Sequence, residues 1–92
     1  MQPEAAQVLA LQALGWVAGN DELFPLFLGA TGADIGELRQ RAAEPEFLAA
    51  VLDFLMMGDA WVVAFCDAEG HAYTAPQSAR AALPGGAVVN WT

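Results

Sequence analysis

Apolar side chains recur at every third or fourth position along almost the whole chain, which is the spacing of amphipathic helices. Two prolines, Pro3 and Pro45, stand where a helix can begin, because the first helical residue needs no N–H group. Glycines such as Gly19 and Gly70 stand where a helix ends. The pattern predicts six helices, over residues 3 to about 18, 21–28, 34–43, 45–55, 59–69 and 74–83.

Asp and Thr residues mark the predicted helix N-termini, because their side-chain oxygens accept backbone N–H groups that have no partner inside the helix. For the second helix either Asn20 or Asp21 can serve, and we assign Asp21. Glu37 follows Asp34 at the spacing of a capping box, in which the two residues satisfy each other's N–H groups. The predicted caps are Asp21, Asp34, Asp59 and Thr74.

The fourth predicted helix carries apolar residues on more than one face, which is typical of a helix enclosed by others. These residues are Phe47, Leu48, Val51, Leu52, Phe54 and Leu55. The remaining positions at helical spacing are Glu46, Ala50, Asp53 and Met57. We therefore expect this helix at the centre of the fold, with Asp53 facing water.

The two halves of the chain resemble each other. Aligning Phe27 with Phe65 also aligns Gly32 with Gly70, so a core aromatic residue and a helix-ending glycine recur in both halves. The alternative is a chance alignment of two alanine-rich helical segments. We predict a compact all-α domain of six helices over residues 1–86, made of pseudo-repeats at about 9–45 and 47–84 and followed by a tail at 87–92.

The net charge indicates which classes of binding partner suit the protein. Eleven acidic residues stand against three arginines and no lysine, which gives a formal net charge of −8. Lys and Arg supply most of the affinity for phosphate backbones and anionic lipids, so we expect neither nucleic acid nor membrane as a partner. A basic protein suits this charge better.

A cytoplasmic location fits the remaining composition. Cys66 is the single cysteine, which excludes an intramolecular disulfide and favours a reducing compartment. The first residues lack the basic region of a signal peptide. The stretch 47–66 is long enough to span a membrane, but Asp53 and Asp59 would each cost roughly 2.5 to 3.5 kcal/mol there. We expect two helices that meet at a turn.

Cys66 and His71 form the one cluster of metal-ligand types, with Asp67 and Glu69 between them. A structural zinc site needs four ligands, and a Cys–His catalytic pair needs a third group to orient it. Because neither set is complete, we assign no catalytic, cofactor-binding or metal-binding residue. A weak metal-dependent enzyme centred on Cys66 and His71 remains as an alternative.

Three stretches, 13–19, 48–55 and 79–86, together with the Trp91-Thr92 end, resemble a family of small uncharacterised bacterial proteins, the domain of unknown function 3572 family. The resemblance covers nearly the whole chain and departs from the family pattern at residues 66–73. It implies a bacterial, cytoplasmic, helical protein. It brings no catalytic residues, and the departure puts a family-wide role for Cys66 or His71 in doubt.

The sequence leaves the biochemical function unknown. Apolar residues make up 57% of a short chain, and a small domain cannot bury them all, so we expect some to meet another protein or a second copy in a homodimer. We therefore favour a protein–protein interaction module, with Met56, Met57 and Trp91 as contact residues. A helical binder of a small apolar ligand is the other alternative.

Overall fold

A computed structural model of the protein describes residues 1–84, which form six α-helices and one 3-10 turn. Their bounds are α1 Pro3–Ala18, α2 Leu23–Thr31, η1 Ile35–Glu37, α3 Leu38–Arg41, α4 Pro45–Leu55, α5 Asp59–Glu69 and α6 Ala75–Ala81. No strand occurs in this part of the chain. The predicted all-helical class is therefore confirmed, while the predicted tail at 87–92, with Trp91, lies outside the described residues.

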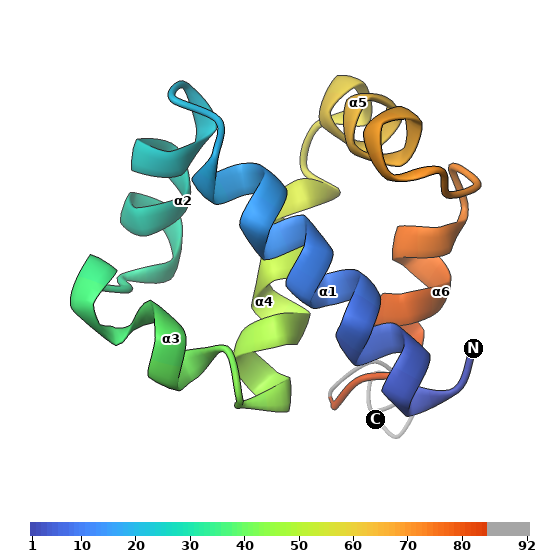
Figure 1. Ribbon diagram of the computed structural model, residues 1–92, viewed down its shortest axis with the longest axis horizontal. Helices are drawn as coiled ribbons and strands as arrows, with labels where there is room; N and C mark the ends of the chain where they lie inside the picture. The colour runs from blue at the N-terminus through green and yellow to red at the C-terminus, as the bar shows by residue number, and fades with distance from the viewer. Residues whose placement is uncertain (85–92) are drawn as a thin grey trace, which may run out of the picture.

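Helices α1, α4 and α6 pack against one another and form the centre of the molecule. Figure 1 shows α1 crossing in front of α4, with α2 and α3 on one side and α5 and α6 on the other. Helix α2 contacts both α1 and α4, and α5 contacts α1 and, through the stacked rings of Trp61 and Phe54, α4. Helices α2 and α3 thus flank one side of this centre, and α5 flanks the other side, next to α6.

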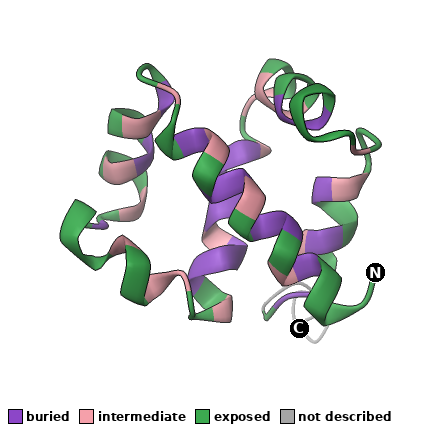
Figure 2. Ribbon diagram, in the orientation of Figure 1, coloured by how far each residue is buried: buried purple, intermediate pink, exposed green. Residues whose placement is uncertain are grey.

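The core lies where α1 and α4 cross, and Figure 2 shows buried segments concentrated on these two helices. Seven of the eleven residues of α4 are buried, as its two-faced apolar pattern predicts, and Asp53 is exposed. Phe27 of α2 meets the rings of Phe47 and Phe54 edge-on, with centroids 5.9 and 5.4 Å apart. These aromatic contacts anchor α2 to α4.

Proline and glycine set several helix boundaries, although α2 begins at Leu23 and continues through Gly29 to Thr31, three residues beyond its predicted end at 28. Pro3 and Pro45 are the first residues of α1 and α4. Gly32 and Gly70 follow α2 and α5 with φ of +70° and +76°, a left-handed conformation that costs least for glycine. Their N–H groups donate to carbonyl oxygens four residues earlier, at 2.9 and 2.8 Å, and so close each helix.

The prediction that Asp21 caps α2 is wrong. The Asn20 Oδ1 accepts the backbone N–H groups of Glu22 and Leu23, at 3.0 and 3.1 Å. These donors are two and three residues after Asn20, a separation at which an Asn side chain commonly accepts backbone N–H groups of its own turn. Asp21 is left exposed.

The prediction that Asp59 is the cap of α5 also needs correction. Gly58 is the N-cap residue, with an extended backbone (φ −126°, ψ 118°), and Asp59 is the first helical residue. A carboxylate there still favours the helix, because the N-terminus carries partial positive charge. Thr74 precedes α6 as predicted, but its side chain makes no capping hydrogen bond; its carbonyl accepts the Ser78 N–H at 3.1 Å.

The third predicted helix, over residues 34–43, is split into η1 and the short α3. Asp34 is the N-cap residue of η1, and the Glu37 carboxylate accepts the Asp34 N–H at 3.3 Å. No residue of η1 or α3 is buried. Leu38 is only partly buried against the core, and because tertiary packing supplies most of the stability of short helices, a segment with so little of it does not extend into a long helix.

Within residues 1–84, no single helix is long and apolar enough to cross a membrane. Helices α4 and α5 reach that length and composition only together, and they are bent by 113° at the break between them.

Candidate interaction site

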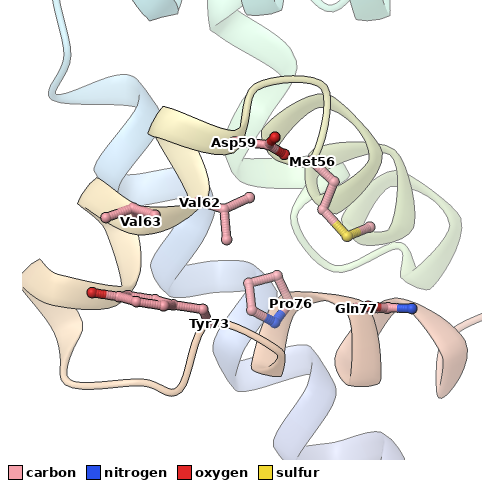
Figure 3. Close-up of a pocket in the computed structure, with 7 residues that line it drawn as sticks. All are labelled: Met56, Asp59, Val62, Val63, Tyr73, Pro76 and Gln77. Atoms are coloured by element: carbon pink, nitrogen blue, oxygen red, sulfur yellow. The ribbon is translucent and has the colours of Figure 1, made fainter.

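A groove of about 380 Å³ runs between α5 and the start of α6 (Figure 3). Its lining mixes apolar and polar side chains and consists of Met56, Asp59, Val62, Val63, Tyr73, Pro76 and Gln77. In Figure 3, Val62 and Val63 of α5 face Tyr73 and Pro76 across the groove. It is larger than two other hollows on the molecule, which measure about 340 and 200 Å³.

The rotation of α5 about its own axis decides which residues reach this groove. Phe65 and Cys66 are fully buried and fix the inner face of the helix. The Phe65 ring packs edge-on against Trp16 of α1, with the centroids 6.0 Å apart. Asp59 and Val63, one helical turn apart, are consequently turned outward, and Val63 keeps 40% of its surface exposed.

The opposite wall begins at Tyr73, whose hydroxyl donates to the Asp67 Oδ1 at 2.8 Å. This bond holds the Tyr73 ring against the end of α5 although 55% of the side chain is exposed. The hydrogen bond and the nearby Asp67 charge raise the pKa of the Tyr73 phenol, because both favour its protonated form. Pro76, buried at the start of α6, completes the wall.

The loop that connects α5 to α6 is held from both sides. The His71 Nε2 and the Gln12 Oε1 of α1 are 2.7 Å apart, in hydrogen-bonding contact. The imidazole also stacks on the Phe65 ring, with centroids 5.7 Å apart. The Cys66 thiol donates to the Ala72 carbonyl oxygen at 3.4 Å. The groove therefore has a fixed outer wall.

Cys66 and His71 use their polar atoms in these structural contacts. Burial, and secondarily the charge of Asp67, raises the pKa of the Cys66 thiol, which disfavours the thiolate that nucleophilic or metal chemistry requires. No group of three His, Cys, Asp or Glu residues that could hold a metal ion occurs within residues 1–84. The arrangement thus gives no geometric support to the metal-dependent alternative.

Met56 and Met57, both predicted contact residues, line different hollows. Met56 belongs to the groove between α5 and α6, whereas Met57, 72% exposed, borders a hollow of about 340 Å³ beside α4. That second hollow also includes Asp53 and Arg41, and the Arg41 guanidinium lies 4.5 Å from the centroid of the Phe47 ring. Trp91 lies outside the described residues.

The predicted caps do not gather at one place; of the four, only Asp59 lines the groove. Sequence reasoning missed five groove residues, Val62, Val63, Tyr73, Pro76 and Gln77. One signal was available, because Asp59, Val63 and Asp67 follow one another at intervals of four and so share one helix face. The wall that faces them depends on the fold of the connecting loop, which periodicity does not describe.

Comparison with known proteins gives a family and no activity. Residues 3–86 match a family model described as Protein of unknown function (DUF3572). No curated protein matches the chain. No solved structure matches it either.

Proposed function

Because the chain belongs to the DUF3572 family, whose function is unknown, we propose a function from the groove alone. The protein is an interaction module that receives an apolar side chain of a partner protein between α5 and α6. We propose a cytoplasmic location, which the single cysteine supports.

The exposure of the groove residues carries this proposal. Val63 and Tyr73 remain 40% and 55% exposed, although both present apolar surface to a concave site. An apolar surface that is concave and rimmed by polar groups is a feature of protein-binding sites. The loop contacts of His71 and Cys66 keep this surface in place before a partner arrives, which lowers the entropic cost of binding.

A protein partner suits the charges of the molecule better than nucleic acid or an anionic membrane. The net charge is −8, and two of the three arginines are engaged in ion pairs, Arg41 with Glu44 and Arg80 with Asp53. Binding to phosphates would need several free cations on one face.

The test is site-specific photo-cross-linking in the native cytoplasm. A photoreactive residue replaces Val63 in the groove, and the matched control replaces Val8, which is 55% exposed on α1 and does not line the groove. We expect a discrete protein adduct from position 63 alone, attached through an apolar segment of the partner. An adduct with a second copy of the chain would identify the module as a homodimer. Equal yields at both positions, or no adduct at either, would contradict the proposal.

A small apolar ligand is the second candidate, because 380 Å³ lies within the range of ligand pockets, roughly 300–1,000 Å³. Nile red, a neutral apolar dye, provides the test. Saturable binding that Val63→Glu abolishes and Val8→Glu leaves intact would favour a ligand site. Unsaturable binding, equal in both variants, would count against it.

We also infer that the two halves are related three-helix units, α1 to α3 and α4 to α6. In support, Phe27 and Phe65 are both fully buried, and Gly32 and Gly70 end their helices with similar positive φ angles, +70° and +76°. Superposition of the halves of an experimental structure on these four residues tests the relationship. Helices α2 and α5 should then coincide, and divergence of their axes would leave only a chance likeness of sequence.

A further inference from the structure

We propose that the partner segment is cationic as well as apolar. One apolar side chain of the partner enters the groove, and two Lys or Arg residues of the partner, one on each side of it in sequence, pair with Asp59 and Asp67. This inference rests on the proposed interaction function and specifies the chemistry of the partner.

The first argument is the order of residues along the exposed ridge of α5. Asp59, Val63 and Asp67 follow one another at intervals of four residues, so they lie in one row. Asp59 and Val63 line the groove, and Asp67 is joined to it by the hydrogen bond from Tyr73. A helix rises 1.5 Å per residue, so the carboxylates are about 12 Å apart along the axis with an apolar site between them.

The second argument is that neither carboxylate has a cationic partner among the described residues. The ion pairs within residues 1–84 are Arg41 with Glu44 and Arg80 with Asp53. Between residues 54 and 79 the chain has three acidic residues and no Lys or Arg. Arg80, which follows directly, donates to Asp53 at 2.7 Å and to the Pro84 carbonyl at 3.2 Å.

These charges select among segments that could fill the groove. A neutral segment would cover two carboxylates without pairing them, and an acidic segment would add repulsion. A segment with cations on both sides of the apolar residue satisfies both carboxylates. Tyr73 occupies only Oδ1 of Asp67, so the second oxygen is left to accept from a partner cation.

The spacing also specifies the pattern of the partner sequence. In a helical segment, cations about 12 Å apart stand eight residues from each other, with the apolar residue four positions from each. In an extended segment, four residues span about 13 Å, so the apolar residue stands two positions from each cation. Both are short amphipathic patterns, and the long Lys and Arg stems add apolar contact.

The experiment selects a random peptide library displayed on phage against the full chain and three variants. The variant Asp59→Asn/Asp67→Asn keeps the shapes of both side chains, and the new amide oxygen beside Tyr73 can still accept its hydroxyl. Asp21→Asn/Glu46→Gln makes the same charge change at two exposed residues outside the groove. Val63→Glu blocks the groove. Circular dichroism and thermal unfolding show that each variant is folded.

We expect peptides selected on the unaltered chain to carry Lys or Arg on both sides of an apolar residue. Their dissociation constants should rise about 2- to 30-fold in Asp59→Asn/Asp67→Asn, which corresponds to two exposed ion pairs. They should rise less than about 2-fold in Asp21→Asn/Glu46→Gln, and binding should be lost in Val63→Glu.

The outcomes separate this inference from the function on which it rests. Peptides that depend on Val63 but lack flanking cations, or that bind Asp59→Asn/Asp67→Asn as tightly as the unaltered chain, would overturn the cationic partner and leave the interaction site standing. Selection that yields no peptide dependent on Val63 would overturn both.

Discussion

Arg80 and Asp53 join α6 to α4: the Arg80 Nε donates to the Asp53 Oδ1 at 2.7 Å. The Arg80 Nη1 also donates to the Pro84 carbonyl at 3.2 Å, so one guanidinium connects two helices and the segment after α6. The pair is partly exposed, with 23% of the Arg80 side chain and 56% of the Asp53 side chain accessible. It therefore fixes the orientation of α6 more than it adds to stability.

A double-mutant cycle of Arg80→Ala and Asp53→Ala should give a coupling energy of about 0.2–1 kcal/mol in urea unfolding. Arg80→Ala alone should destabilise more than Asp53→Ala, because it also removes the bond to Pro84. The control cycle uses Arg41 and Glu44, whose charged atoms are 3.7 Å apart. A coupling energy no greater than in this control would contradict the prediction.

Gly58→Ala should destabilise the protein by about 1–3 kcal/mol. A Cβ at this position would stand 2.7 Å from the Trp61 Cδ2, and the Trp61 ring is stacked on Phe54 with centroids 5.2 Å apart.

Gly15→Ala is the matched control for Gly58→Ala. Nothing lies within 4 Å of a Cβ at this exposed position in α1, so the substitution should stabilise by about 0.5–1 kcal/mol. Thermal unfolding compares the two variants. An unchanged melting temperature in Gly58→Ala would mean that Trp61 turns aside without cost.

Asn20→Ala should cost about 0.5–2 kcal/mol, because its side chain accepts two N–H groups at the start of α2. Asp21→Ala, one residue later, should change the free energy of unfolding by less than about 0.5 kcal/mol, as for an exposed residue without such contacts. Chemical denaturation of both variants checks the assignment. A larger loss in Asp21→Ala would restore Asp21 as the cap.

Stability should fall as pH rises above about 9. The folded state raises the pKa of the Cys66 thiol above its ordinary value of 9.0, and that of the Tyr73 phenol above 10.0. Both groups ionise more readily in the unfolded chain, so their contribution is complete below the unfolded pKa and is lost as pH rises through the folded pKa.

Urea unfolding at several alkaline pH values measures this loss. Cys66→Ala and Tyr73→Phe should each make stability fall less steeply with pH, whatever their effect at neutral pH. Parallel curves for the variants and the unaltered chain would contradict the assignment of the loss to these two groups.

The sequence predicted the elements that local chemistry controls. Pro3, Pro45, Gly32 and Gly70 bound helices where their backbone preferences place them, and the two-faced apolar pattern identified α4 as a central helix. Asn20 and Asp21 show the limit of this reasoning. Both are good capping residues and they are adjacent, so only the geometry of the turn decides between them.

The groove could not be predicted from helical periodicity, because its two walls come from different elements. The Tyr73 wall depends on a loop held by Gln12, which is distant in sequence from His71. Met56 and Met57 were both predicted as contact residues. The end of α4 turns them into separate hollows: α5 and α6 line the hollow at Met56, and α2, α3 and α4 line the hollow at Met57.

The Cys66 thiol is buried and donates to the Ala72 carbonyl, so its reactivity reports local opening of the α5–α6 region. A thiol reagent can modify the chain only when α5 and the following loop separate, so the labelling rate measures how often that separation occurs. The free energy of this local opening can therefore be measured without introducing a new cysteine. A segment bound in the neighbouring groove would slow the labelling. The labelling rate of Cys66 would therefore report both the local opening of the loop and the binding of a partner.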